Sequence, residues 1–380
     1  MATTIAIVKE RAAGESRVAA TPETVRKLIK LGAHVRVETG AGDTASITDT
    51  DFADAGAQVG DLAAIMQGAN VVLGVQAPAL ELLQGAAPGA RIAAIFDPFG
   101  RRDLINDYAA AGLEGLAMEL MPRITRAQSM DVLSSQSNLA GYKAVLACAD
   151  NFGRAFPMMM TAAGTITAAR VFIMGVGVAG LQAIATAKRL GAQVSATDVR
   201  SATREQIQSL GAKPIFVDSV AGIEGEGSGG YATEMGEEYR LAQAELVSSH
   251  IAKQDIVITT ALIPGRAAPR LVTDAQIATM KNGSVIFDLA VAQGGNVEGS
   301  QPDRLVERHG VKIIGYANTP AHLATDASAL LARNFLNFLS AFWDEAAGEP
   351  VLDDEIGTAI RLTQGGRIVH PRLLEQGNLT

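Results

Sequence analysis

Short apolar runs alternate with amphipathic segments along the first 120 residues of the chain. Runs rich in β-branched residues predict strands at 5–8, 34–38, 70–75, 91–96 and 116–120. The segments between them, with apolar positions at helical spacing, predict helices at 22–31, 51–57, 62–66, 79–83 and 104–111. Strands that alternate with helices in this way predict a parallel sheet covered on both faces.

A second array of the same kind begins at Val171. Its strands are predicted at 171–174, in a run that ends on Asp198, and at 215–217, 255–260, 284–289 and 311–315. Two longer helical patterns occupy 139–156 and 318–342. We therefore expect an α/β protein with two Rossmann-like, doubly wound parallel-sheet domains joined by two long interdomain helices. The expected domains are residues 1–135 with 330–380, and residues 136–329.

Two polar segments interrupt these patterns. Residues 122–138 are too irregular for a strand and are predicted to form an interdomain loop. Residues 219–240 are rich in glycine, with no strand before them and no apolar helix after them, and predict a mobile loop. Such a loop is either functional or simply disordered, and Tyr231 beside Gly230 is what a closing lid would carry.

The C-terminal tail predicts a β-hairpin. Residues 359–362 and 367–370 flank Gly365 and Gly366, a pair that favours a tight turn. An exposed hairpin at the end of the chain is a candidate for dimer contacts, and it is equally consistent with an ordinary surface arm.

The strongest local signal for chemistry is a glycine motif after the strand at 171–174. Gly175 permits a tight turn, Gly177 lets the backbone approach a pyrophosphate, and Gly180 lets the next helix pack on the strand. Asp198 ends the following strand, where a carboxylate accepts hydrogen bonds from ribose hydroxyls and disfavours a 2′-phosphate. Arg200 could face a 2′-phosphate instead, but the position of the acid favours NAD(H).

Composition narrows the function classes. The chain has 380 residues, 48% of them hydrophobic, and a formal net charge of −8 with no basic block, which argues against nucleic acid and against an anionic membrane surface. The sequence shows no signal peptide and no span long enough for a bilayer, so we expect a cytosolic protein without direct membrane insertion. Cys148 is the only cysteine, and the five histidines lack metal-ligand spacing, so no metal is expected.

The polar segment is the best candidate to line a nicotinamide site. Arg123, Gln128, Asp131 and Ser134 supply a cation, an amide, a carboxylate and a hydroxyl, enough to orient a carboxamide and a ribose. The alternative, that Asp131 or Ser134 merely caps the following helix, stays open. A dehydrogenase acting on an alcohol or amine needs an acid or base beside the nicotinamide, and the scattered histidines offer no clear candidate. Hydride transfer between two nicotinamide rings needs only placement and exclusion of water.

Six stretches together resemble a known family, the soluble NAD(H)-binding alpha-1 component (domain I) of proton-translocating NAD(P) transhydrogenases, which is similar to alanine dehydrogenase. These stretches are V-K-E-R with G-E-S-R-V, M-E-L-M-P-R-I-T-R-A-Q-S-M-D-V-L-S-S-Q-S-N-L-A-G-Y, F-P-M-M-M-T-A-A-G-T, M-G-V-G-V-A-G-L-Q-A-I-A-T-A-K-R-L-G-A, G-G-Y-A-T-E-M-G-E-E and T-T-A-L-I-P-G. The resemblance covers almost the whole chain.

The resemblance implies a function and a set of site residues. The chain would bind NAD(H) and exchange hydride directly with NADP(H) on a separate component, coupled to proton translocation by membrane-spanning subunits. It would be a homodimer held at the cytoplasmic face of the inner membrane through these partners. The nicotinamide side would be formed by Arg123, Gln128, Asp131 and Ser134, with Tyr231 at the tip of the closing loop. The resemblance places Val178, Asp198, Val199, Arg200, Gly230 and Leu262 at or near the nucleotide, in addition to the three motif glycines.

Alanine dehydrogenases carry a substrate-binding lysine and a catalytic histidine where this chain has Gly74 and Phe96. Arg17 remains, but one arginine cannot both anchor a carboxylate and shuttle a proton. These departures argue against amino-acid oxidation. An alanine or opine-type dehydrogenase and a non-catalytic NAD-sensing module are the two alternatives to a transhydrogenase component.

Overall fold

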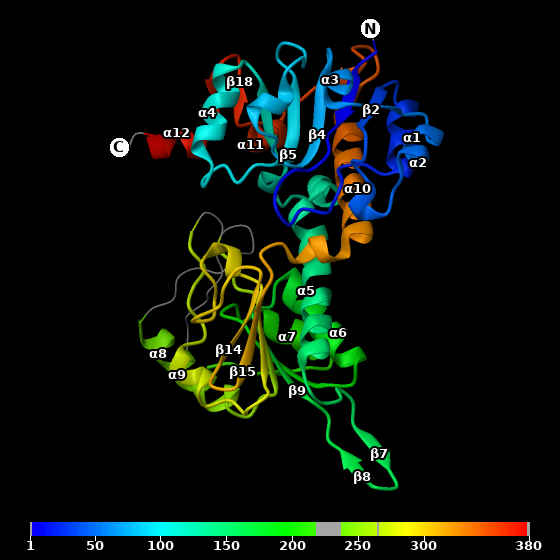
Figure 1. Cartoon of the computed structure of the whole chain (residues 1–380). Helices are drawn as coiled ribbons and strands as arrows, with labels where there is room; N and C mark the ends of the chain where they lie inside the picture. The colour runs from blue at the N-terminus through cyan, green and yellow to red at the C-terminus, as the bar shows by residue number, and fades with distance from the viewer. Residues whose placement is uncertain (1, 218–236, 264–265, 378–380) are drawn as a thin grey trace. The chain divides into compact units, whose positions relative to one another are not determined.

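A computed structural model describes residues 2–217, 237–263 and 266–377 (Figure 1). Two compact units make up the chain: Met1–Gln136 with Ala321–Thr380, and Ser137–Pro320. The first unit is therefore discontinuous in sequence. Its second segment starts at Ala321, nine residues or so before the boundary expected at 330.

The first unit contains a six-stranded parallel sheet with the order β3-β2-β1-β4-β5-β6. Its strands are β1 (Thr4–Ile7), β2 (His34–Glu38), β3 (Gln58–Gly60), β4 (Val71–Gln76), β5 (Arg91–Ile95) and β6 (Glu114–Ala117). Its helices are α1 (Pro22–Lys30), α2 (Asp49–Asp54), α3 (Leu62–Met66), α4 (Arg102–Ala110), α10 (Ala324–Phe342), α11 (Glu355–Ile360) and α12 (Pro371–Gly377). Most predicted elements are confirmed with ends within three residues, while 79–83 is a 3-10 turn, η2 (Leu80–Leu83), and β3 was missed because it has only three residues.

The second unit contains a seven-stranded sheet with the order β11-β10-β9-β12-β13-β15-β14. Its strands are β9 (Arg170–Met174), β10 (Gln193–Thr197), β11 (Lys213–Pro214), β12 (Ile256–Thr259), β13 (Val285–Asp288), β14 (Arg304–Arg308) and β15 (Val311–Gly315). Its helices are α6 (Val178–Arg189), α7 (Thr203–Ser209), α8 (Glu237–Ile251) and α9 (Asp274–Ile277). The edge strand β14 is antiparallel to β15 and mostly exposed, so it lacks the apolar run by which the other strands were predicted.

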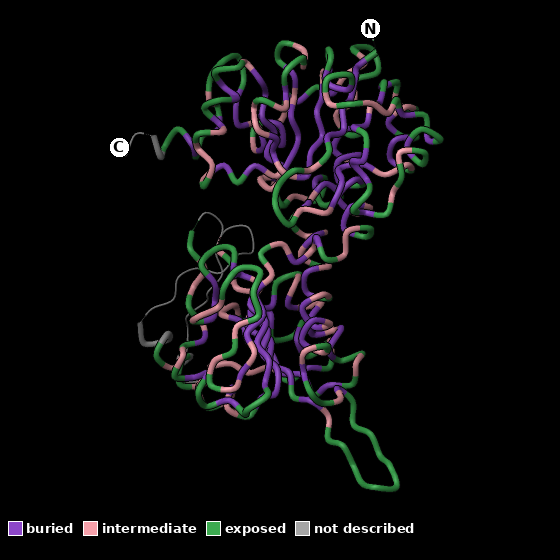
Figure 2. Tube along the Cα trace, in the orientation of Figure 1, coloured by how far each residue is buried: buried purple, intermediate pink, exposed green. Residues whose placement is uncertain are grey.

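Each sheet is covered on both faces, as predicted. Ile5 and Ile7 of β1 belong to one apolar cluster with α1 and α10, whereas Ala6 belongs to a second cluster with α3 and α4. Val171 and Phe172 of β9 divide in the same way between two clusters of the second unit. Successive residues of a strand point to opposite faces, so strands buried on both sides read as continuous apolar runs. Figure 2 shows this burial along the strands of each sheet.

The two predicted interdomain helices differ in detail from the expectation. The first is α5 (Val132–Asn151), which begins within the polar segment predicted to be a loop and contains the boundary between Gln136 and Ser137. The other half of that segment is a 3-10 turn, η4 (Thr125–Met130). The second, α10, begins at Ala324 and lies in the first unit, after a 3-10 turn η7 (Thr319–Leu323) in which the chain passes from one unit to the other.

The C-terminal hairpin is not an exposed arm. It consists of β18 (Thr363–Gln364) and β19 (Arg367–Ile368), with the Gly365-Gly366 turn in the left-handed region. Thr363 is fully buried and donates to the carbonyl of Leu113 at 2.8 Å, while Gly115 N–H donates to the Thr363 hydroxyl at 2.9 Å. These contacts attach the hairpin to the edge of the first sheet at β6.

A different hairpin is exposed. β7 (Met159–Thr161) and β8 (Gly164–Ile166) project from the second unit in Figure 1 and are exposed along their whole length in Figure 2. Met160 is 79% exposed, and Met158, Met159 and Ile166 are exposed as well. In the described part of the chain, no helix has the length and apolarity that a bilayer span requires.

Candidate functional site

The turn after β9 has the geometry that a dinucleotide motif needs. Gly175 has φ +100°, and a Cβ atom there would lie 2.6 Å from Oγ1 of Thr260, so glycine is required. A Cβ atom at Gly180 would overlap the carbonyl oxygen of Gly175, which allows α6 to pack directly on the turn. At Gly177, by contrast, nothing lies within 4 Å of the Cβ position, so the backbone is open to a ligand.

The N-terminus of α6 follows this turn. Gly177 is the N-cap residue and makes no side-chain cap, and the N–H of Leu181 donates to its carbonyl at 2.9 Å. The first N–H groups of an α-helix have no partner within the helix and carry partial positive charge. Val178, the first helical residue, is exposed. The open space at Gly177 and this helix terminus together fit a pyrophosphate.

Asp198 lies beside this turn at the tip of β10 and is only 7% exposed. Its carboxylate accepts from the N–H of Val176 at 2.7 Å, and from the backbone N–H and Nε of Arg200 at 2.9 Å each. Burial alone would raise the pKa of Asp198, but these hydrogen bonds and the guanidinium charge outweigh it and hold the pKa below its usual value. Asp198 is therefore ionised at neutral pH, and Arg200 is engaged with it. Val199 lies between them, half-buried.

Arg123, Gln128, Asp131 and Ser134 lie in the first unit, in and around η4. Asp131 caps α5: its carboxylate accepts from the N–H of Ser134 at 2.9 Å and from the Ser134 hydroxyl at 2.6 Å. The capping alternative is therefore realised, although both side chains stay partly accessible. Gln128 and Arg123 are exposed.

Helix α10 holds η4 in place. Asn334 and Asn337 both donate from Nδ2 to the carbonyl of Ser129, at 2.9 and 3.0 Å. Arg126 pairs with Asp354, the N-cap residue of α11, and stacks over the ring of Phe342. Gln128 is thus an exposed amide on a firmly anchored turn.

Three further predicted residues remain. Leu262 is exposed and follows β12 by three residues, close in sequence to Thr260, which contacts the glycine turn. Gly230 and Tyr231, with the loop predicted to close, lie outside the described residues.

The positions that would serve amino-acid oxidation carry no such chemistry. Arg17 is 4% exposed, and its guanidinium is bound to Glu15 at 2.6 Å and to Oε1 of Gln136 at 2.9 Å. Phe96 is fully buried and packs edge-on against Tyr108. At Gly74 a Cβ atom would lie 2.8 Å from the carbonyl of Gln76. None of these three positions offers a substrate anchor or a proton carrier.

Two buried carboxyl groups at the carboxyl edge of the first sheet were not foreseen. Glu10 accepts from the N–H of Val75 at 2.6 Å, and burial raises its pKa to about 7. Glu119 accepts from the N–H groups of Phe96 and Asp97 at 2.7 Å each, and burial raises its pKa to about 7 as well. Both follow strands, but sequence alone does not reveal that an acid at a strand end turns inward.

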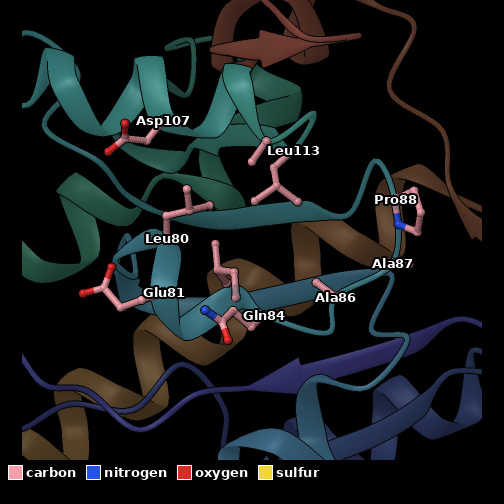
Figure 3. A pocket seen from close by; sticks show the side chains of 10 residues that line it. Leu80, Glu81, Gln84, Ala86, Ala87, Pro88, Asp107 and Leu113 are labelled. Carbon is pink, nitrogen blue, oxygen red and sulfur yellow. The ribbon is translucent and has the colours of Figure 1, made fainter.

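The largest hollow in the described structure lies apart from these residues. It has a volume of about 760 Å³, and Figure 3 shows that its lining is mainly apolar, with Glu81 and Asp107 as its charged groups. A smaller one of about 300 Å³ follows β1 and β4, where Lys9, Glu10 and Arg101 line it. Neither contains a residue predicted for the nucleotide, because the glycine turn presents an open surface and not an enclosed cavity.

The chain is similar to known proteins over its whole length. Residues 6–140 match the family described as alanine dehydrogenase/PNT, N-terminal domain, and residues 144–371 match its C-terminal domain. The first of the separate chains of NAD(P) transhydrogenase subunit alpha in Rhodospirillum rubrum is 54% identical, over 98% of this chain and 99% of that protein. The protein of the same name in Rickettsia prowazekii is 44% identical, over 96% of both. Alanine dehydrogenase of Halomonas elongata is 28% identical, over 98% of this chain and 96% of its own length.

Solved structures give the same picture. The structure of a transhydrogenase from Sinorhizobium meliloti has a TM-score of 0.88 and 51% identity, and covers 96% of this chain and 100% of its own. An L-alanine dehydrogenase has a TM-score of 0.80 and 26% identity, with full coverage of both chains.

Proposed function

Because the chain belongs to the alanine dehydrogenase/PNT family, we propose that it is the NAD(H)-binding component of a proton-translocating NAD(P) transhydrogenase. NAD(H), when bound, supplies or accepts a hydride, and NADP(H) on a partner component is the other reactant. Membrane-spanning partner subunits couple this exchange to proton movement and hold the chain at the cytoplasmic face of the inner membrane. The chain itself acts as a homodimer.

The glycine turn and Asp198 hold the nucleotide in this proposal. The pyrophosphate binds at Gly175, Gly177, Val178 and Gly180, where the N–H groups at the start of α6 are open to it. Asp198, with Val199 and Arg200, takes the adenosine ribose, and Gly230 and Leu262 complete the site. The observation that carries the proposal is the ionised carboxylate of Asp198, fixed beside the turn by the N–H of Val176.

The residues of η4 orient the reacting end. Gln128, as an exposed amide on an anchored turn, can hydrogen-bond the carboxamide or the ribose. Asp131 and Ser134 are held rigid by each other and offer further acceptor and donor capacity, while Arg123 orders the segment and Tyr231 shields it. None of these groups has to move a proton, because hydride exchange between nicotinamide rings needs placement alone.

The buried pairing of Arg17 supports this function over oxidation of an amino acid. A substrate carboxylate would have to displace Glu15 and Gln136 from a guanidinium that is already satisfied. With Phe96 in the core, no acid or base remains at the position where the amino-acid dehydrogenases carry one.

Reconstitution tests the proposal. The chain is combined with the NADP(H)-binding component and the membrane subunits in vesicles, and reduction of NADP⁺ by NADH is followed together with vesicle pH. We expect hydride exchange that depends on this chain. Binding of NADH without exchange would identify an NAD-sensing module instead, and formation of NADH from NAD⁺ and an amino acid by the isolated chain would identify a dehydrogenase.

A further inference from the structure

One peptide group in the glycine turn is held from both sides. The carbonyl of Gly175 accepts from Oγ1 of Thr260 at 2.9 Å, and the N–H of Val176, in the same peptide, donates to Asp198 at 2.7 Å. Thr260 follows β12 and Asp198 follows β10, the two strands that flank β9. Neighbouring strands therefore fix the plane of the peptide at which the turn begins.

Thr260 is itself held by its surroundings. Its N–H donates to the carbonyl of Met174 at 2.9 Å, which continues the pairing of β12 with β9. The next residue, Ala261, is bound through both backbone groups by the side chain of Asn296. Oδ1 of Asn296 accepts from the Ala261 N–H at 3.0 Å, and Nδ2 donates to the Ala261 carbonyl at 2.9 Å.

Asn296 is well suited to this role because it is completely enclosed. It is fully buried, and the second proton of Nδ2 goes to the carbonyl of Pro269 at 2.8 Å, so both donors of the amide are used. Its own N–H donates to the buried carboxylate of Asp288 at 3.2 Å, which also accepts from the Ser300 hydroxyl at 2.6 Å. The amide therefore acts from a rigid framework at the end of β13.

We propose that Thr260 and Asn296 are positioning residues for the phosphate-binding turn. The proposal rests on the proposed function, because it concerns the same nucleotide site. Glycine at 175 can adopt other backbone conformations at low cost, so the turn needs an external constraint to stay in one of them. Thr260 supplies the constraint, and Asn296 fixes the backbone from which Thr260 acts. The N–H groups of Gly177 and Val178 are thereby aimed at the pyrophosphate before it binds.

The central test compares two adjacent threonines. Thr260→Val keeps the shape of the side chain and removes the hydrogen bond to Gly175, whereas Thr259→Val removes weaker contacts, at 3.3 and 3.4 Å, to β13. We expect Thr260→Val to weaken binding of NADH and of ADP about three- to tenfold, the effect of one hydrogen bond on a preorganised site. Thr259→Val should lower the melting temperature and leave both dissociation constants unchanged.

A ligand without phosphate separates positioning from general damage. Adenosine contacts the same pocket but not the pyrophosphate-binding groups, so its affinity should be the same in the wild type and in Thr260→Val. Asn296→Ala should reproduce this selective loss, and the double variant should lose less than the sum of the two, because both residues act on one turn. Thr260→Val is the decisive variant if Asn296→Ala fails to fold.

Equal binding of NADH by the wild type and Thr260→Val would overturn the inference and leave the proposed function intact. An equal loss for ADP and adenosine would also overturn it, because the defect would then not lie at the phosphate-binding groups. A wild-type chain that binds neither NADH nor ADP would overturn the proposed function, and the inference with it.

Discussion

At the scale of single residues, the carboxylate of Asp198 has two roles that conflict in part. It is expected to accept ribose hydroxyls, yet it already accepts from Val176 and Arg200. Each carboxylate oxygen has more than one acceptor site, so a ribose can be added without loss of the internal bonds. The pairing also keeps the guanidinium of Arg200 directed at Asp198, which answers the question that the sequence left open about this arginine.

Nucleotide selectivity should therefore depend on the charge of Asp198. In Asp198→Asn the repulsion of a 2′-phosphate is removed and the guanidinium of Arg200 loses its anionic partner. We expect the ratio of NADPH to NADH affinity to rise roughly tenfold, measured by fluorescence titration of both nucleotides. The double variant with Arg200→Gln should not show the gain, and an unchanged ratio in Asp198→Asn would contradict the role assigned to the charge.

Gln128 provides a second test at this scale. Its amide is exposed on a turn that Asn334 and Asn337 hold, so shortening it moves one contact without disturbing the fold. Gln128→Asn should slow hydride transfer in the reconstituted complex on the order of 10- to 100-fold and leave the NADH dissociation constant nearly unchanged. A large loss of NADH affinity would show that Gln128 serves ground-state binding instead.

At the scale of elements, the junction of β9 with α6 separates two uses of glycine. Gly180 is required by packing, since a Cβ atom would overlap the carbonyl of Gly175, whereas the Cβ position of Gly177 faces open space. Sequence spacing predicts the motif, but only the packed structure shows which glycine serves the fold and which is open to a ligand.

The two alanine substitutions should therefore have opposite signatures. Gly180→Ala forces α6 away from the turn and should lower the free energy of unfolding by about 1–3 kcal/mol, measured by urea denaturation. Gly177→Ala should keep its stability, because its φ of −82° suits alanine, and lose NADH affinity by titration. A stable Gly180→Ala, or a Gly177→Ala that binds NADH normally, would contradict this division.

The ends of β5 and β6 carry the clearest pH dependence. Burial raises the pKa of Glu119 from 4.5 to about 7, so between these values the folded protein keeps a proton that the unfolded chain has released. The free energy of unfolding that this group contributes therefore falls as the pH rises from about 5 to 7, by on the order of 2–3 kcal/mol.

Glu119→Gln should remove this dependence. The amide oxygen can still accept from the N–H groups of Phe96 and Asp97, but the group no longer titrates. We expect the drop in melting temperature between pH 5 and pH 8 to be smaller than in the wild type by several degrees. Glu23→Gln is the control, since hydrogen bonds from Lys27 and Arg333 hold the pKa of Glu23 below its usual value and it does not titrate in this range. Parallel curves for the wild type and Glu119→Gln would refute the assignment.

At the scale of the whole molecule, the surface proposed for self-association moves from the C-terminal hairpin to β7–β8. The C-terminal hairpin is attached to β6 through Thr363, whereas β7–β8 exposes a group of apolar side chains at its tip and base. Clustered exposed apolar residues favour burial in an interface. We therefore expect the dimer to use β7–β8.

Met160→Ser tests this expectation, because Met160 is 79% exposed and its loss costs the isolated chain nothing in packing. The dimer dissociation constant should rise at least about tenfold by sedimentation equilibrium, with an unchanged circular dichroism spectrum. Val369→Ser, an exposed apolar residue next to the C-terminal hairpin, serves as the control and should leave the dimer intact. The reverse result would return the interface to the C-terminal hairpin.

Much of this protein follows from the sequence because the signals are local. Apolar runs at strand period, helix caps such as Thr21, and the spacing of Gly175, Gly177 and Gly180 depend on residues near each other in the chain, so they predicted the two arrays, the α/β class and the nucleotide motif. The family resemblance extended this to the polar segment that contains Gln128 and Asp131.

The tertiary structure decided what depends on distant residues. That Arg17 is sealed by Gln136, that Thr363 joins the C-terminal hairpin to the sheet, and that Asn296 fixes the backbone beside the glycine turn are contacts between residues 35 to 248 positions apart. No local pattern encodes such pairings, because a side chain's partner is set by how the strands and helices pack. The sequence therefore identified the nucleotide motif, and the fold determined which residues hold it in place and which are already engaged.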